Sequence, residues 1–325
     1  MLPGNKKLLI LYILDILKDF SDENHLLSQN DIMKKLYSIY GVECDRKSIG
    51  ANIDSLIDFG YGIVKTRKGS FLAEREFEPS EVQFLVDAVF SSRCISSKHS
   101  IDLAKKLSST LSNYQRKQYN YVYKSNELNR TSSKELFYNI DIINEAIEKD
   151  KQIQFNYKKT TFKNVNLKDK TYVVNPYYLI NNQGKYFLVC NYDYFNEIGN
   201  YKVERIYNIK ILDSPRKPIN KLKEFEKGFD IVKYANENIY MFSTKSIDAL
   251  LKLSSDKSSI PVEEWFGKNA TFFEKDSNLY AKINANETSL IYWCIQYGED
   301  VELLEPKETR EKIKNIVNII KQKYE

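Results

Sequence analysis

Histidine and cysteine are scarce in this chain of 325 residues, which contains two histidines and four cysteines. The cysteines, Cys44, Cys94, Cys190 and Cys294, are scattered, and none belongs to a Cys-x-x-Cys pair. Neither a zinc site nor a disulfide framework is therefore expected. We expect buried thiols in a reducing compartment, and neither a metal nor a cofactor.

Long apolar runs and catalytic motifs are also missing. No run approaches the roughly 20 apolar residues of a membrane-spanning helix, and residues 8–17 carry Tyr12 and Asp15 at helical spacing without a small-residue cleavage site. A P-loop, a GxGxxG fingerprint and the spacings of Ser/His or Cys/His nucleophiles are absent from the sequence. We expect a cytoplasmic, nucleoid-associated protein that has no membrane partner and is not an enzyme.

Charge and aromatic residues are unevenly distributed. Apolar residues make up 42% and charged residues 29%, which suits a globular protein, and the length allows two or three domains. The net charge is only +5, but residues 151–233 contain 16 Lys or Arg against 8 Asp or Glu, together with 15 Phe or Tyr. Cations among aromatic rings suit a nucleotide or a single-stranded nucleic acid. A Lys-rich rim around an ordinary β core explains the same composition equally well.

Three amphipathic helices are predicted near the N-terminus. The first covers residues 8–20, and the second follows a capping signal formed by Ser28 and Asp31. Asp45 is placed to cap the third helix, which ends near Gly60. A compact helical head is therefore expected at this end of the chain.

A basic hairpin is predicted after these helices. Two short strands at 61–64 and 70–72 surround the basic run 65–69. Three helices and this hairpin, with the run Asp-Arg-Lys-Ser-Ile at 45–49, resemble the winged helix-turn-helix heads of the DeoR type. The resemblance implies that the third helix lies in the major groove of operator DNA. The expected DNA-binding residues are Arg46, Lys47, Ser48, Ala51, Lys65, Arg67 and Lys68.

Acidic residues limit the expected contact with DNA. Residues 1–75 contain 11 Lys or Arg and 10 Asp or Glu, so the basicity is local. Asp54 and Asp58 on the outer face repel phosphate, so only the N-terminal turn of the third helix is expected to approach DNA closely. Gly50 is explained either by a close approach of DNA or as a helix defect of about 1 kcal/mol relative to Ala. A winged helix that contacts only protein is the alternative.

Two further amphipathic helices, the first beginning at Pro79, are predicted within residues 78–135, where they connect the head to the rest of the chain. Residues 113–133 are polar and Tyr-rich and are expected to be a flexible linkage. Ser132 and Glu135 have the spacing of a capping box, which predicts the start of another helix.

Short sequence runs identify the next region. Ile-x-Phe-x-Tyr, Asn-Pro-x-x-Leu, Tyr-Phe-Leu and Val-Glu-Arg-Ile occur in this order between residues 153 and 206. They resemble the WYL domain of bacterial regulators, named for a Trp-Tyr-Leu run that is Tyr-Phe-Leu in this chain. Five short strands are predicted here after one helix. The resemblance implies that residues 136–215 form a small Sm-like or SH3-like barrel that senses a ligand.

In this family, aromatic and basic positions line a ligand pocket. The expected ligand-binding residues are Tyr157, Tyr178, Tyr186, Lys202 and Arg205. Residues 202 and 205 point to opposite faces of a straight strand, so both serve one pocket only if the strand bends or ends between them. Lys202 is commonly Arg in the family, and Arg is the better bidentate phosphate ligand. The alternative for Tyr157 and Tyr186 is core packing with a hydroxyl at the rim.

The C-terminal region predicts a mixed module. Residues 238–242 read as a strand and 245–253 as a helix, and the elements that follow complete a β-α-β-β-α-β order with one more helix over 307–324. This order predicts a ferredoxin-like plan. The run Leu303-Leu-Glu-Pro-x-x-x-Arg310 resembles the extension that follows many WYL domains and commonly contacts a second subunit. The apolar row on the last helix favours core packing over a partner interface.

The predicted domains are a winged helix-turn-helix at 1–77, a helical connector at 78–135, a WYL domain at 136–215, a linker at 216–234 and an extension at 235–325. They predict a ligand-responsive repressor of a stress or phage-defence operon, which binds double-stranded operator DNA as a homodimer and senses a nucleotide or nucleic-acid-derived ligand. The alternative is an accessory protein that binds single-stranded RNA or DNA through the WYL domain and modulates a partner enzyme of a defence system.

Overall fold

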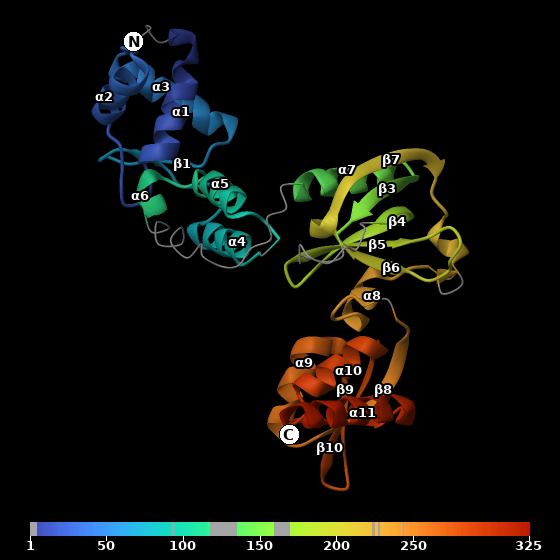
Figure 1. Cartoon of the computed structure of the whole chain (residues 1–325). Helices are drawn as coiled ribbons and strands as arrows, with labels where there is room; N and C mark the ends of the chain where they lie inside the picture. Colours follow the sequence, from blue (N-terminus) through green and yellow to red (C-terminus); the bar gives the residue numbers. More distant parts are fainter. Residues whose placement is uncertain are drawn as a thin grey trace. The chain divides into compact units, whose positions relative to one another are not determined.

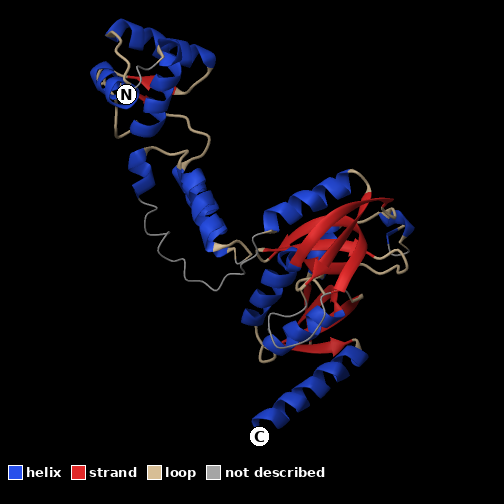
Figure 2. Ribbon diagram, turned by 45° about the horizontal axis from the view of Figure 1, so that its top comes forward, coloured by secondary structure: helices blue, strands red, loops and turns tan. Residues whose placement is uncertain are grey.

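Helices and antiparallel sheets both contribute to the chain, in agreement with the predicted α+β class (Figure 1; Figure 2). The computed structural model describes residues 5–92, 94–117, 135–158, 170–222, 225–226, 228–242 and 244–325. The chain divides into two units, Met1–Ser132 and Ser133–Glu325. No helix among the described residues is long and apolar enough to cross a lipid bilayer.

The first unit begins with packed helices. They are the short η1 (Lys6–Leu8), α1 (Leu9–Phe20), α2 (Gln29–Tyr40) and α3 (Arg46–Phe59). Their apolar faces share one buried core, and the caps expected from the sequence are confirmed. Ser28 and Asp31 form a capping box at the start of α2, and the Asp45 carboxylate accepts from the Ser48 N–H at the start of α3 (2.8 Å). These caps fix where α2 and α3 begin.

A two-stranded hairpin follows α3. It consists of β1 (Ile63–Lys65) and β2 (Ser70–Leu72). The Leu27 N–H donates to the Ser70 carbonyl (3.0 Å), and the Ser70 N–H donates to the Leu27 carbonyl (2.9 Å). Gly69 has a φ of 156°, and a Cβ there would lie 2.6 Å from the Leu27 backbone. Only glycine fits this approach, which ties the hairpin to the loop before α2.

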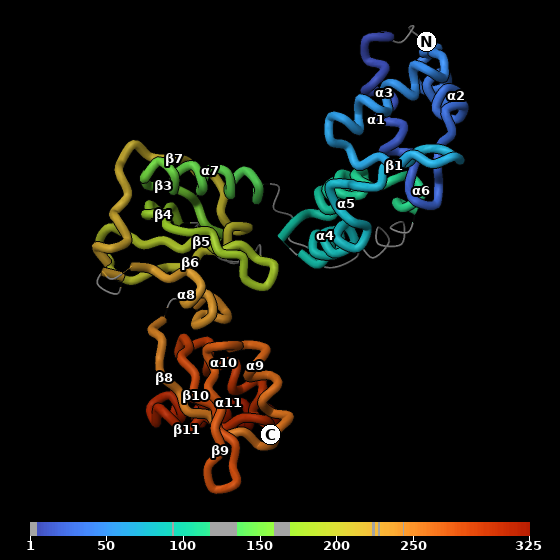
Figure 3. The backbone as a smooth tube through the Cα atoms, turned by 180° about the vertical axis from the view of Figure 1, so that it is seen from behind, coloured from blue at the N-terminus to red at the C-terminus, as the bar shows by residue number. Residues whose placement is uncertain are grey.

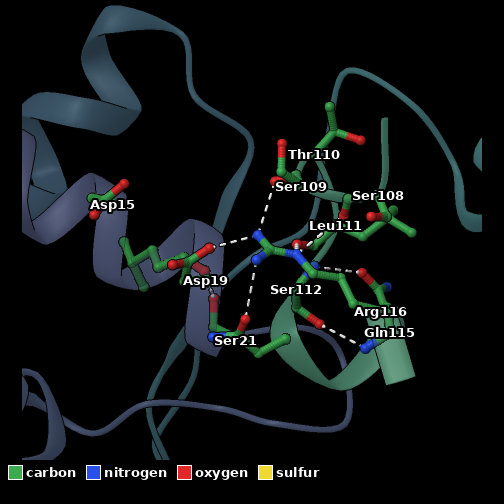
Figure 4. A network of polar contacts seen from close by, with 12 residues as sticks. Asp15, Asp19, Ser21, Ser108, Ser109, Thr110, Leu111, Ser112, Gln115 and Arg116 are labelled. Atoms are coloured by element: carbon green, nitrogen blue, oxygen red, sulfur yellow. Dashed lines mark hydrogen bonds and ion pairs between the residues drawn. The ribbon is translucent and has the colours of Figure 1, made fainter. Parts of the chain in front are cut away.

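The first unit also contains α4 (Pro79–Ser91), α5 (Ser97–Ser108) and α6 (Asn113–Arg116). The guanidinium of Arg116 joins α6 to α1 (Figure 4). It donates to the Asp19 carboxylate (2.7 Å) and to the carbonyls of Ser108 (3.1 Å), Ser109 (2.9 Å) and Leu111 (2.9 Å). The helices predicted as a connector are therefore hydrogen-bonded to the N-terminal helices, while the predicted domain boundaries stay predictions.

Further hydrogen bonds of buried polar groups connect the α6 region to the loop that follows α1. The Asp22 carboxylate accepts from the Ser112 hydroxyl (2.7 Å) and lies 2.6 Å from the His25 ring nitrogen. Arg75 donates to the carbonyls of Ser21 (2.7 Å) and Thr110 (3.1 Å). Burial raises the pKa of Asp22, but the hydrogen bonds from Ser112, His25 and the Asn24 N–H outweigh it, so the pKa is lowered. The carboxylate form therefore stabilises the folded unit.

The second unit begins with α7 (Leu136–Glu148) and a five-stranded sheet. The strands are β3 (Lys151–Tyr157), β4 (Lys170–Asn182), β5 (Lys185–Asn191), β6 (Gly199–Lys202) and β7 (Ile206–Pro215). Their order is β6-β5-β4-β3-β7, and α7 packs against β3, β4 and β7 (Figure 2). Because β6 and β7 lie at opposite ends of this order, the described strands form an open sheet, and the predicted Sm-like or SH3-like barrel is not confirmed. Of the capping box predicted for α7, Ser132 lies outside the described residues.

The region after the sheet starts with η4 (Ile219–Lys221) and α8 (Ile231–Glu237). The helix α8 contacts both the sheet and the C-terminal module, and Figure 3 shows it next to β6. The module contains β8 (Ser246–Leu253), α9 (Ser259–Phe266), β9 (Thr271–Lys275), β10 (Asn278–Asn286), α10 (Glu287–Gln296), β11 (Val301–Glu305) and α11 (Lys307–Tyr324), with short 3₁₀ turns at Asp256–Ser258 and Gly267–Asn269. Its sheet has the order β11-β8-β10-β9 around a core centred on Trp293.

Two elements of this module differ from the prediction, although the β-α-β-β-α-β order is the one predicted. Residues 245–253 were expected to be helical but contain β8, where Ala249, Leu251 and Leu253 are buried with a period of two. That period is typical of a strand. Residues 238–242 were expected to be a strand but form a turn, because Met241 has a φ of 56° and cannot continue an extended chain.

The four cysteines form no disulfide. Cys94, Cys190 and Cys294 are buried, and Cys44 is half-buried. Burial raises the pKa of the Cys190 thiol and raises that of Cys294 to about 12. Burial was expected of all four thiols and is confirmed for these three.

Candidate functional site

A short turn between β6 and β7 brings two predicted ligand-binding residues together. β6 ends at Lys202, and a 3₁₀ turn, η3 (Val203–Arg205), follows before β7 begins. Residues three positions apart in a 3₁₀ turn lie on the same side, because the turn contains three residues. The strand therefore ends between Lys202 and Arg205, and both side chains line one pocket.

A buried amide of α7 holds this turn. Asn139 is fully buried, and its Nδ2 donates to the Ile206 carbonyl (2.8 Å) and, at 3.5 Å, to the Val203 carbonyl. The Lys158 N–H, at the end of β3, donates to the Arg205 carbonyl (3.0 Å). The role of Asn139 was not predicted from the sequence; the residue lies on the buried face of α7 together with Leu136 and Ile143. An amide three residues after Leu136 and four before Ile143, on the same side of a helix, was the available signal.

The pocket has a volume of about 590 Å³, within the roughly 300–1,000 Å³ of small-molecule sites. The cations on its wall are Lys185, Lys202 and Arg205, and none of the described residues that line it is Asp or Glu. Lys185 comes from the start of β5, after a tight turn in which Gln183 and Gly184 both have positive φ. The wall is therefore built to receive an anion.

The electrostatics of the pocket agree with this reading. Burial, and then the positive charges of Lys185 and Arg205, lower the pKa of Lys202. A bound anion relieves both effects, because it compensates for lost hydration and screens the like charges. The Tyr157 hydroxyl accepts from the Lys202 N–H (3.3 Å), and burial raises the pKa of Tyr157, so this hydroxyl stays neutral and can donate to a ligand.

Two of the five predicted ligand-binding residues do not line this pocket. Tyr178 stacks on Phe229 with ring centroids 4.8 Å apart and packs against a buried cluster of the sheet. Tyr186 is half-buried and lies between Lys185 and Phe187, which do line the pocket. Successive residues of a strand point to opposite faces, so Tyr186 is on the other side of β5. Of the predicted set, the pocket collects Tyr157, Lys202 and Arg205.

Aromatic residues from outside the sheet complete the pocket. Tyr240 and Phe242 come from the turn after α8, and Tyr292 comes from α10. These rings were not predicted to line the pocket, because residues 238–242 were interpreted as a strand of a separate module. The abundance of aromatic residues was the only signal in the sequence, and it did not indicate which rings meet the cations.

One domain family matches the part of the chain that contains the sheet. Residues 138–211 match the family model of the WYL domain. The match includes β3–β6, η3, the first part of β7 and the three cations, whereas Tyr240, Phe242 and Tyr292 lie outside it. No curated protein matches the chain.

Two solved structures are similar to the chain at low identity. Proteasome accessory factor B/C (PafBC) of Arthrobacter aurescens shares 13% identity over 97% of this chain and 48% of its own, with a TM-score of 0.31. The chain therefore spans about half the length of that protein. A CRISPR Cas-related protein shares 15% identity over 97% of this chain and 84% of its own, with a TM-score of 0.41.

The Asn-Pro run of the WYL domain has a structural role. Asn175 is fully buried, and its Nδ2 donates to Asn191 Oδ1 (3.0 Å) and Asp193 Oδ1 (2.8 Å). Its Oδ1 accepts from Gln152 Nε2 (3.0 Å) and from the Lys217 N–H (2.9 Å). The bond from Lys217 fastens the chain after β7 to the sheet, and the other three join β4 to Gln152 of β3, Asn191 of β5 and Asp193. The run therefore indicates the fold of the domain rather than its ligand.

A separate basic surface lies on the first unit. Arg46, at the start of α3, lines a recess of about 340 Å³ together with Lys65, Arg67 and Lys68 of the hairpin. Of the other predicted DNA-binding residues, Lys47 and Ala51 are exposed on α3 and Ser48 is half-buried. The structure thus brings four of the seven predicted residues to one recess and leaves the other three beside it on α3.

One cation of this surface is paired. Lys65 Nζ lies 2.6 Å from Asp54 Oδ1, so the hairpin and α3 are joined by an exposed ion pair. This pair reduces the charge that Lys65 presents, and it also offsets the repulsion that Asp54 would exert on phosphate. Gly50 lies close to α2, since a Cβ there would be 3.2 Å from Gln29 Nε2.

Proposed function

We propose that the chain is a ligand-responsive DNA-binding transcriptional regulator, a repressor that acts as a homodimer. The WYL domain senses a nucleotide or nucleic-acid-derived ligand in the pocket between η3 and the turn after α8. The observation that carries this proposal is the pocket itself, in which three cations and the Tyr157 hydroxyl converge without a lining carboxylate among the described residues. Binding at this pocket requires no catalytic residue.

The first unit supplies the proposed DNA-binding surface. Helices α1–α3 and the hairpin β1–β2 have the order of a winged helix-turn-helix, in which the second helix of the motif reads the major groove. Arg46 and Lys47 lie at the N-terminal end of α3, the end from which such helices contact bases. Arg67 and Lys68 on the hairpin are exposed and suited to phosphate.

The regulatory step requires unequal binding. A ligand changes DNA occupancy only if it binds the DNA-competent and DNA-incompetent arrangements with different affinities. In this proposal the ligand favours the incompetent arrangement and releases the operator.

A second function is supported by a different observation. Tyr157, Tyr172 and Tyr201 are half-buried and form a cluster with centroid distances between 5.0 and 6.3 Å. Rings beside cations suit stacked bases of single-stranded nucleic acid. The alternative is therefore an accessory protein that binds single-stranded RNA or DNA through the WYL domain and modulates a partner enzyme.

Footprinting of the full chain on its own upstream DNA, with and without short oligonucleotides, separates the two functions. The regulator requires salt-dependent duplex binding that is lost in Lys47→Ala and Arg67→Ala and kept in Lys106→Ala, which removes an exposed cation on α5. Tight single-strand binding that ignores these head variants but disappears in Arg205→Ala would support the accessory protein. Absence of any duplex footprint would refute the regulator.

A further inference from the structure

Two stacked rings on the wall of the pocket remain exposed. Phe242 and Tyr292 stack with centroids 5.6 Å apart and an interplanar angle of 24°, yet they are 38% and 57% exposed. Tyr240 lies edge-on to Phe242 at 6.4 Å. Single exposed rings are common on protein surfaces. Here, however, all three rings line the pocket that contains Lys202 and Arg205.

The backbone is held so that these rings face the pocket. Met241 has a φ of 56°, which is unfavourable for a residue with a side chain, and its side chain is buried against the sheet with Phe187 and Ile180. Tyr240 and Phe242, on either side of Met241, both line the pocket. The Tyr240 hydroxyl donates to Gln296 of α10 (3.0 Å), which fixes the turn to the C-terminal module.

We propose that Phe242 and Tyr292 form a stacking site for the base of a nucleotide whose phosphate lies on Lys202 and Arg205. The inference rests on the proposed ligand pocket and names its occupant as one 5′-phosphorylated nucleotide unit, either free or at the end of a strand. The C-terminal module thereby supplies half of the binding site.

The chemistry of the wall supports this occupant over a simple anion. A phosphate alone would use the cations and leave the rings exposed, whereas an uncharged aromatic ligand would leave three cations without a counter-charge. Amide groups of Gln183 and Gln296 also line the pocket and can bond to the edge of a base. The volume of about 590 Å³ suits one nucleotide unit and excludes a duplex.

Calorimetric titration of the full chain with four probes tests the stacking site. The probes are AMP, a 5′-phosphorylated diadenylate, ribose 5-phosphate and inorganic phosphate. AMP is expected to bind about 5- to 150-fold more tightly than ribose 5-phosphate, the range that stacking of one base supplies. Binding of AMP and the diadenylate with similar affinity indicates a strand end as well as a free nucleotide, and binding of AMP alone indicates the free nucleotide.

Variants assign the two halves of the site. Tyr292→Ala should lose most of the preference for AMP while its affinity for ribose 5-phosphate stays the same, and Tyr292→Phe should retain the preference. Lys202→Ala should weaken both probes. The control is Tyr194→Ala, which removes a ring that is 96% exposed and does not line the pocket.

Two results would overturn the inference in distinguishable ways. Equal binding of AMP and ribose 5-phosphate, unchanged in Tyr292→Ala and weakened in Lys202→Ala, refutes the stacking site and keeps the anion pocket of the proposed function. No binding of any probe refutes both the stacking site and the nucleotide pocket. Operator footprints measured on the same preparation report the DNA-binding half independently.

Discussion

Asn139→Ala tests whether the η3 turn positions the cations of the pocket. The side chain is fully buried, and its Nδ2 donates to the Ile206 carbonyl at 2.8 Å. Truncation removes this donor from a buried carbonyl, which costs about 1–3 kcal/mol. The Val203 carbonyl keeps the bond from the Ile206 N–H, so no second acceptor is lost.

One contribution to the change in the free energy of unfolding has the opposite sign. Asn139 Oδ1 is buried without a hydrogen-bond partner, and the substitution removes this unfavourable group. The free energy of unfolding of the second unit should therefore fall by about 1–2 kcal/mol, in the lower part of the range for a lost buried donor. If this loss of stability is confined to η3, the η3 turn is ordered in a smaller fraction of the molecules. The affinity for AMP then falls by up to about 5- to 30-fold, because only molecules with the ordered turn bind it.

The assay combines urea unfolding, followed by circular dichroism, with AMP titration. Asn144→Ala is the matched control, because it makes the same change at an exposed position of α7. Equal stability of Asn139→Ala and wild type would contradict the hydrogen-bond argument. Reduced stability with unchanged AMP affinity would show that the bond supports the fold without positioning Lys202 and Arg205.

Three further predictions concern the first unit. Asp54→Asn releases Lys65 from its ion pair and removes a negative charge, so the affinity for duplex DNA should rise. The slope of log affinity against log salt concentration, measured by fluorescence anisotropy, should steepen by up to about 1. An unchanged slope would mean that Lys65 does not contact phosphate. Arg116→Ala should lower the free energy of unfolding by about 1.5–3 kcal/mol, whereas Lys106→Ala on the exposed face of α5 should change it by less than about 0.5 kcal/mol. Because folding lowers the pKa of Asp22, the carboxylate stabilises the folded unit. This stabilisation is fully present above the ordinary pKa of 3.8 and is lost as the pH falls from there through the lower pKa of the folded state. Acid unfolding of Asp22→Asn should therefore lack this component.

Local signals in the sequence predicted much of the first unit and part of the sheet. Ser28 and Asp45 were identified as caps because a short polar side chain before an apolar periodic run has few other roles. The condition set for Lys202 and Arg205, that the strand must end between them, is met by η3. Such features depend on neighbours in the sequence and can be read from it.

The features that were missed depend on residues far apart in the chain. Residues 245–253 were predicted to be a helix but contain a strand, because β8 pairs with β10 and β11. A short apolar run fits the periodicity of a helix or of a strand, and its pairing partners cannot be read from the run itself. Phe242 and Tyr292 are 50 positions apart, and their meeting with Lys202 follows from packing around Met241. Tyr186 shows the opposite error. It was assigned to the pocket because it is the first residue of the Tyr-Phe-Leu run, but successive strand residues point to opposite faces, so Tyr186 lies on the other side of β5.

The distribution of the thiols has a practical consequence. Cys94 lies in the first unit, Cys190 in a central strand of the WYL sheet and Cys294 in α10, and all three are shielded from solvent. A shielded thiol reacts with an alkylating reagent only while the structure around it is transiently open. A timed alkylation followed by peptide mapping would thus compare the breathing motions of three parts of the native chain, without an introduced label.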